Sequence, residues 1–250
     1  MDPVAAEGFR RAADAYERGR PAYPFEAVAW LVEALRIGPD TTVVDVGAGT
    51  GKFTAQLVPT GATIIAVEPV DAMRATLTAL LPTVVALSGM AEALPLETAS
   101  ADAIVAAQAS HWFNGPVAVA EFHRVLRPGG RLGVIWNERD TSVDWARELD
   151  AIVESYRGER PHPRSQRDVE LGDLFGSPQH ADFSHDQLVD VATLRDRVAS
   201  MSFVAVLPDL EQARVLDRVA ALVARHPATA GQAAFPLPYR TNAFWAERLR

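Results

Sequence analysis

The sequence of 250 residues predicts an α/β fold, a Rossmann-like sheet of seven mostly parallel strands with helices on both faces and a helical insertion. Apolar runs of strand length alternate with helical patterns up to Asn137, which implies right-handed crossovers and a parallel sheet. The first run ends in the glycine-rich stretch VVDVGAGTGKF at residues 43–53, which opens a helix. An acidic residue, Glu68, ends the next run, as in nucleotide-binding sheets.

Proline and glycine mark the limits of the first elements. Residues 4–18 predict a short helix, which Pro21 and Pro24 separate from the next helix. Pro24 begins that second helix, which carries an apolar stripe, and Gly38 ends it. Strands are then expected at residues 42–46, 62–68 and 83–87, with helices at 51–58 and 71–81 between them.

The alternation of strand and helix continues to Asn137 and then stops. Up to that point we expect strands at 101–107 and 131–137 and a helix at 114–126. Beyond it, apolar residues from Trp145 to Tyr156 recur at the spacing of an amphipathic helix, and a polar loop with four arginines follows at 157–168. The remainder predicts a strand at 183–188, helices at 192–203 and 209–225, and an extended tail as an antiparallel last strand.

Composition excludes several classes of chemistry. The chain has no cysteine, so disulfides, cysteine-based zinc sites and thiol nucleophiles are excluded. Its net charge of −8, without a dense run of lysine or arginine, argues against nucleic acid as a partner. Lys52 is the only lysine, and its place in the glycine-rich stretch makes it a poor Schiff-base candidate. No segment has the apolar length of a signal peptide or a membrane span, so we expect a cytoplasmic protein without membrane contact.

The glycine-rich stretch has the spacing G-x-G-x-G, with Gly47, Gly49 and Gly51. Glycines allow a tight turn and a close approach of the backbone to a ligand, and the following helix offers free N–H groups. Glu68 lies 68 − 47 = 21 residues beyond Gly47, close to the ~20 expected for a ribose-binding carboxylate. A P-loop would need different residues at positions 46 and 53, and a structural turn without a ligand stays open as the alternative.

Together with this turn, an ordered set of motifs resembles the class I S-adenosylmethionine-dependent methyltransferases, in particular the small-molecule branch of the trans-aconitate and ubiquinone or menaquinone type. The motifs are AADAYERGRPAYP, VVDVGAGTGKFT, AVEPVDAM, SGMAEALPL, HRVLRPGGRLGVIWN and LPYRTNAFWAERL. The resemblance implies S-adenosylmethionine as cofactor, S-adenosylhomocysteine as product, a small-molecule methyl acceptor and no metal. We expect a single methyltransferase domain with the segments 1–37 (helical, over the site), 41–137 (the cofactor-binding core), 138–180 (an insertion or lid, because the alternation of strand and helix breaks after Asn137) and 181–250 (completing the sheet).

The resemblance also implies which residues hold the cofactor. The set comprises Tyr16, Arg20, Asp45, Gly47, Ala48, Gly49, Gly51, Glu68, Met90, Ala91, Glu92 and Gln108. Asp45 would anchor the glycine turn or contact the amino group of the cofactor, and Glu68 would accept from both ribose hydroxyls. Met90 stands where many relatives carry a polar residue, so Glu92, the backbone or packing would have to hold the adenine.

The acceptor is expected between the N-terminal segment, the SHWF sequence at 110–113 and the segment 138–180, near the carboxyl ends of the strands. His111 is the candidate general base. The candidate acceptor contacts are Ser110, Trp112 and Tyr23. An oxygen nucleophile is favoured, because AAQASHWF follows the fourth strand in place of the N/D-P-P-aromatic motif of amino methyltransferases. A carboxylate acceptor would need an arginine such as Arg20 rather than a base, and structural roles for His111 and Trp112 remain alternatives.

Two other functional classes stay open. A non-catalytic S-adenosylmethionine-binding protein would keep these motifs without turnover. An NAD-dependent oxidoreductase is opposed by the glycine spacing, because Lys52 stands where G-x-G-x-x-G has its third small residue. Equilibrium binding of S-adenosylhomocysteine or of NADH would separate the two cofactors.

Overall fold

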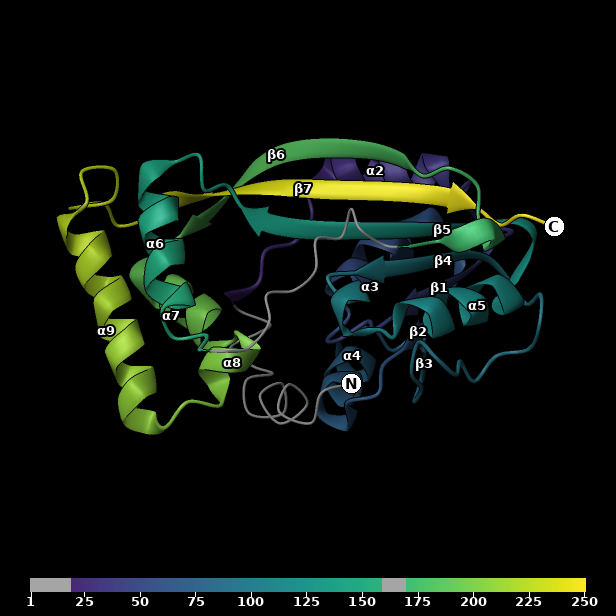
Figure 1. Cartoon of the computed structure of the whole chain (residues 1–250), viewed down its shortest axis with the longest axis horizontal. Coiled ribbons are helices and arrows are strands. Elements are labelled where there is room, and N and C mark those ends of the chain that lie inside the picture. The colour runs from purple at the N-terminus through teal and green to yellow at the C-terminus, as the bar shows by residue number, and fades with distance from the viewer. Residues whose placement is uncertain (1–18, 159–169) are drawn as a thin grey trace. The chain divides into compact units, whose positions relative to one another are not determined.

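The computed structural model describes residues 19–158 and 170–250. The expected helix at 4–18, the cofactor candidate Tyr16 and most of the arginine loop lie outside the described residues. The strands are β1 Thr42–Val46, β2 Thr63–Val67, β3 Val85–Leu87, β4 Ala101–Ala107, β5 Leu126–Arg139, β6 Gln179–Val189 and β7 Phe235–Glu247. They form one sheet in the order β3-β2-β1-β4-β5-β7-β6 (Figure 1).

The sheet is parallel from β3 to β5. β1 pairs in parallel with β2 and β4, β2 with β3, and β4 with β5. Beyond β5, the backbone N–H of Arg248 donates to the oxygen of Gly130, and the N–H of Asp140 donates to the oxygen of Pro238. Residue numbers therefore fall along one strand as they rise along the other, so β7 is antiparallel to β5. The predicted seven-stranded, mostly parallel sheet with an antiparallel closing strand is confirmed.

Helices connect the strands largely as expected. They are α2 Phe25–Ala34, α3 Lys52–Leu57, α4 Asp71–Leu80, α5 Gly115–Val125, α6 Asp144–Glu154, α7 Val191–Ala199, α8 Ser202–Ala205 and α9 Asp209–Arg225, with 3-10 turns η1 Val58–Thr60, η2 Ser110–Trp112 and η4 Gly172–Leu174. The expected single helix at 192–203 is wrong: Met201 has an extended backbone with ψ 129°, which separates α7 from α8. The hydroxyl of Ser200 donates to the carbonyl of Arg197 and satisfies that end of α7. No described helix is long and apolar enough to cross a membrane.

The described chain forms two compact units. The core unit contains residues 22–137, 170–183 and 241–250, and the second unit contains residues 19–21, 138–158 and 184–240. This division differs from the expected insertion at 138–180, whose two ends fall in different units. The reason is packing: the apolar face of α6 shares a core with α7 and α9, whereas residues 171–175 pack into the core unit.

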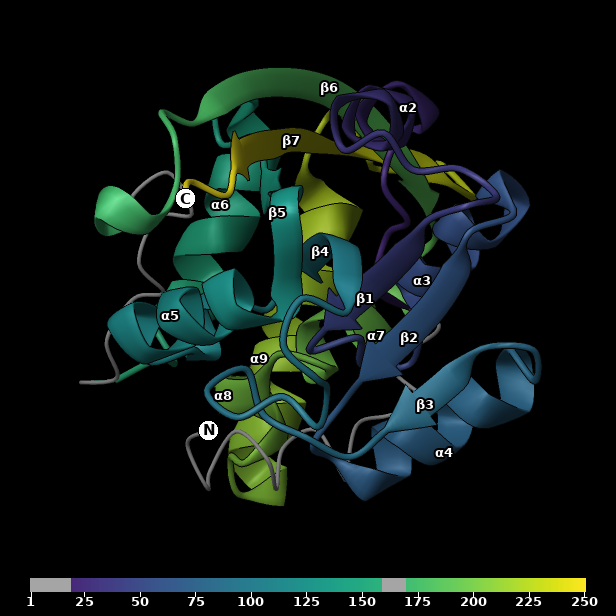
Figure 2. The ribbon, with the colours of Figure 1, turned by 90° about the vertical axis from the view of Figure 1, so that its right-hand side faces the viewer.

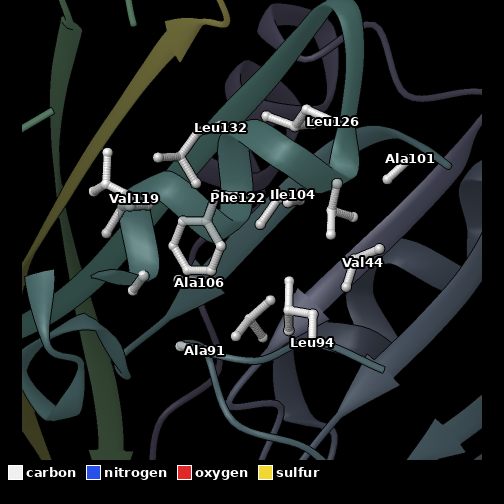
Figure 3. Packing of buried hydrophobic residues seen from close by; sticks show 14 of the residues in the cluster. Val44, Ala91, Leu94, Ala101, Ile104, Ala106, Val119, Phe122, Leu126 and Leu132 are labelled. Carbon is white, nitrogen blue, oxygen red and sulfur yellow. The ribbon is translucent and has the colours of Figure 1, made fainter. Parts of the chain in front are cut away.

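The core unit has an apolar layer on each face of its sheet. Side chains alternate between the two faces along a strand, so Val43 joins one layer and Val44 and Ile104 join the other. α5 covers the layer that contains Val44, and α3 and α4 lie on the opposite face (Figure 2). Figure 3 shows Phe122 of α5 beside Ile104 and Leu132. Helices on both faces of the sheet are thereby confirmed, and the carboxyl ends of the strands are left to the loops that carry the site.

Candidate functional site

The glycine turn lies between β1 and α3. Gly47, Gly49 and Gly51 all have positive φ, at +71°, +60° and +90°, a conformation that other residues rarely adopt. A Cβ on Gly47 would also lie 2.7 Å from the Cβ of Ala109. A Cβ on Gly49 would meet no heavy atom closer than the sulfur of Met73, at 3.9 Å. Conformation therefore requires glycine in this turn, and the backbone at Gly49 is open to the close approach of a ligand.

Glu68 follows β2 and is buried beside the turn. Its Oε2 accepts from the N–H of Gly49 at 2.9 Å, and its Oε1 accepts from the N–H of Val70 at 2.8 Å. Burial raises the pKa of Glu68, while these two hydrogen bonds and the positive charge of Arg74 oppose the rise. Each carboxylate oxygen keeps a further lone pair. Glu68 thus braces the glycine turn and still offers acceptors to a ribose.

Asp45, in β1, is fully buried below the same turn. Its Oδ2 accepts from the hydroxyl of Thr54 on α3 at 2.6 Å, whereas its buried Oδ1 has no hydrogen-bond partner among the described residues. Burial raises the pKa of Asp45 to about 7; the Thr54 hydrogen bond opposes the rise and the charge of Glu68 adds to it. Thr54 was not predicted from sequence. The available signal was that a carboxylate in a buried strand requires a nearby donor.

The segment expected beside the adenine has mixed exposure. Met90 is 44% exposed, whereas Ala91 is buried in the core. The Oε1 of Glu92 accepts from the N–H of Asn114 at 2.7 Å, just before α5. Ala48, in the glycine turn, is partly buried against the core. Ala91 packs in the core and Glu92 bonds Asn114, so Met90 is the member of this segment with apolar surface available to a base.

Gln108 follows β4 and has a positive φ of 56°, which is unusual for a residue other than glycine. Its side-chain Nε2 donates to the carbonyl of Asn137 at 3.1 Å, and its Oε1 accepts from the N–H of Asn137 at 3.0 Å. Its own N–H donates to the carbonyl of Ile135 at 3.0 Å. The amide of Gln108 therefore ties the exit of β4 to β5, and the structure gives this residue a positioning role.

His111 lies in η2, directly after the exit of β4. Its ring centroid is 4.3 Å from that of Trp112, and it meets the ring of Trp136 edge to face at 4.7 Å. Trp136 is a buried residue of β5 that was not predicted from sequence. The signal for it was its position near the carboxyl end of the strand beside β4, the edge where sites of parallel sheets open. Two aromatic rings therefore limit the orientations of the imidazole.

The N-terminal candidates Tyr23 and Arg20 belong to different units. Tyr23 is buried and meets the ring of Phe53 on α3 edge to face at 5.2 Å. Its backbone N–H and carbonyl both bond the side-chain amide of Gln56, at 3.0 and 2.8 Å. These contacts give Tyr23 a packing role beside α3. Arg20 belongs to the second unit, where its charge acts on Arg197.

Comparison with known proteins agrees with this fold and site. A family described as "Methyltransferase domain" matches residues 44–134. An uncharacterised methyltransferase of Mycobacterium tuberculosis is 43% identical over 233 residues, covering 93% of this chain and 92% of the relative. The protein described as a "Putative Type II Methyltransferase" from Anaeromyxobacter dehalogenans has the same fold, with a TM-score of 0.64, 24% identity, and 92% and 97% coverage of this chain and that one.

A further structural neighbour was solved with S-adenosylhomocysteine, the product that S-adenosylmethionine leaves after methyl transfer. It is the geranyl diphosphate C-methyltransferase of Streptomyces coelicolor with S-adenosylhomocysteine, at a TM-score of 0.50 and 16% identity, covering 89% of this chain and 78% of that one. The chain belongs to the S-adenosylmethionine-dependent methyltransferases. This membership decides against the oxidoreductase that the sequence left open.

The glycine turn fits this cofactor on three structural grounds. The buried Oδ1 of Asp45 lacks a partner within the described chain, and the cofactor carries an ammonium group that would supply one. The backbone at Gly49 has open space in front of it, and Glu68 retains lone pairs for ribose hydroxyls. Two buried carboxyl groups also complement a ligand that carries a sulfonium and an ammonium.

Proposed function

We propose that this methyltransferase transfers a methyl group to an oxygen nucleophile of a small molecule, with His111 as general base. The observation that carries the proposal is the contact between the two halves of the site. Gly47 in the glycine turn lies against Ala109, and a Cβ there would also be 3.6 Å from the ring of Phe113. The loop between these two residues carries His111, so cofactor turn and candidate base share one edge of the sheet.

The cofactor residues follow from the contacts of the turn. Gly47, Gly49 and Gly51 would line the methionine and ribose, Glu68 would accept from the ribose hydroxyls, and Asp45 would accept from the amino group. When bound, S-adenosylmethionine would supply a methyl group on a sulfonium, and in-line transfer of that methyl group would leave S-adenosylhomocysteine as a neutral thioether, without a metal or a covalent intermediate. The residues of the chain have to align the nucleophile and exclude water.

The proposed task of His111 is to remove the proton of an acceptor hydroxyl. Histidine suits proton transfer near neutral pH, and a base must be held within hydrogen-bond reach of the proton it removes. The rings of Trp112 and Trp136 limit the orientations of the imidazole, which supports this role. The aromatic surface of Trp112 would pack against an apolar acceptor or face a cation.

The test is a screen of metabolite extracts with labelled S-adenosylmethionine, followed by kinetics on the methylated compound. We expect His111→Ala to lower kcat by about 10²-fold, because proton removal is lost. Its affinity for S-adenosylhomocysteine should stay unchanged. His180→Ala is the matched control, because His180 is exposed on β6. Undiminished kcat in His111→Ala would show that the acceptor needs no base from this residue, and methylation at nitrogen or carbon in the product would refute the oxygen assignment.

A further inference from the structure

A buried arginine in the second unit lacks a complete set of partners. Arg197, on α7, is only 6% exposed. Its Nε donates to the hydroxyl of Tyr239 in a long hydrogen bond of 3.3 Å. Its Nη1 is buried and has no hydrogen-bond partner among the described residues. A guanidinium is fully charged in proteins, and burying such a charge without a partner costs folding free energy.

Two further arginines act electrostatically on Arg197. Burial, together with the charges of Arg20 and Arg139, lowers the pKa of Arg197 to about 10, although Tyr239 opposes this shift. Arg139 has its own carboxylate, because it is paired with Asp150. The ring of His185 stacks on Tyr239 at 5.4 Å, and burial lowers the pKa of His185, which favours its neutral form.

Backbone contacts of Gly19 place the neighbouring Arg20 close to Arg197. A Cβ on Gly19 would lie 2.5 Å from the backbone nitrogen of Arg197, so the chain at Gly19 is pressed against α7. The side-chain Nε2 of Gln187 on β6 donates to the carbonyl of Gly19 at 3.3 Å. Arg20 is the next residue, and it is only half-buried. Two independent contacts of Gly19 therefore fix the position of Arg20 beside Arg197.

We propose that Arg197 and Arg20 bind the carboxylate group of a small molecule. A carboxylate accepts two parallel hydrogen bonds from a guanidinium, which would satisfy the buried Nη1. Its negative charge would also offset the repulsion between the two arginines. Arg197, Arg20 and Tyr239 all belong to the second unit, so this proposal does not depend on the assignment of His111.

The experiment measures thermal unfolding of the whole chain with added anions at constant ionic strength. The probes are acetate, succinate, inorganic phosphate and chloride. We expect acetate and succinate to raise the unfolding temperature with saturation, because a ligand of the folded state alone stabilises it. In Arg197→Met the saturable rise should disappear, and in Arg197→Lys the apparent Kd should increase at least tenfold. Arg195→Met is the matched control on the same helix, since the side chain of Arg195 is 39% exposed.

A second variant keeps the test independent of folding. Arg20→Gln changes a half-buried residue and should weaken succinate binding at least threefold. Without anion, Arg197→Met should unfold at the wild-type temperature or above it, because an unpaired buried charge is removed. The proposal is overturned if no carboxylate stabilises the wild type with saturation, if phosphate or chloride does so better than succinate, or if Arg197→Met responds as the wild type does.

One more measurement shows whether the carboxylate belongs to the cofactor or to another small molecule. If S-adenosylhomocysteine binds Arg197→Met at least tenfold more weakly and competes with succinate, the carboxylate belongs to the cofactor. If its affinity is unchanged, the carboxylate belongs to another small molecule. Either result supports a carboxylate site at Arg197.

Discussion

Asp45 and Glu68 place two acidic side chains in buried positions beside one glycine turn. Glu68 is satisfied by two backbone N–H groups, at Gly49 and Val70, whereas Asp45 has Thr54 on one oxygen only. A carboxyl group that lacks water and partners favours its neutral form. Asp45 is therefore the group whose protonation should respond most to folding and to a cationic ligand.

We expect Asp45 to make the free protein less stable as pH rises. Burial raises its pKa from the ordinary value of 3.8 to about 7 in the folded chain. The unfolded chain thus loses this proton first, so the free energy of unfolding falls between about pH 4 and pH 7 and levels off above pH 7. The contribution is about 2–4 kcal/mol, from 1.36 kcal/mol per pKa unit.

The measurement is urea unfolding of wild type and Asp45→Asn from pH 4.5 to 8. The difference between the two proteins should change across this range, because asparagine does not titrate. Binding of S-adenosylmethionine should also tighten as pH rises towards 7 in the wild type and not in the variant. Parallel stability curves would show that Asp45 is ionised in the folded protein throughout.

Substitution of Glu68 tests cofactor binding more directly than substitution of Asp45. In Glu68→Gln one carboxylate oxygen is replaced by a donor, which removes charge-assisted hydrogen bonds to the ribose. We expect the Kd for S-adenosylhomocysteine to rise about 10- to 100-fold. Calorimetry measures it, with the exposed Glu97→Gln as the control. Because Glu68 also holds the N–H groups of Gly49 and Val70, the unfolding temperature must be recorded too; unchanged affinity would remove Glu68 from the site.

The strands that line the site were predictable because their signals are local. β1 at Thr42–Val46 and β4 at Ala101–Ala107 agree with the predicted bounds, since β-branched or apolar runs there stop at glycine or polar residues. α9 at Asp209–Arg225 also agrees, between Pro208 and Pro227. The positions of Trp136 beside His111 and of Tyr239 beside Arg197 were not predictable, because they join segments distant in sequence and leave no periodic pattern.

Gln108 shows how an element is fixed by one side chain. It has φ of 56°, and its amide makes both hydrogen bonds to the backbone of Asn137. We expect Gln108→Ala to lower the free energy of unfolding by about 1–3 kcal/mol, because both bonds are lost. Gln108→Gly should be less destabilised than Gln108→Ala, since glycine adopts positive φ without strain. Urea unfolding measures both, and equal stability of wild type and Gln108→Ala would contradict this role.

The two compact units share strands rather than a linker. β5, β6 and β7 each contribute residues to both units. The second unit nevertheless has its own apolar core, in which Leu222 of α9 is fully buried together with Leu149 of α6. A strand that is hydrogen-bonded in the sheet cannot unfold in one unit without loss of its pairing in the other. We therefore expect a single cooperative unfolding transition of the whole chain.

Leu222→Ala tests this coupling. The substitution leaves a cavity in the core of the second unit and should lower the free energy of unfolding by about 2–5 kcal/mol. S-adenosylhomocysteine, whose proposed contacts lie in the core unit, should restore about 2.7 kcal/mol at 100 times its Kd. Near-ultraviolet and far-ultraviolet circular dichroism should follow one transition, which the ligand shifts as a whole. Two separate transitions, of which the ligand shifts only one, would show that the shared strands do not couple the two units.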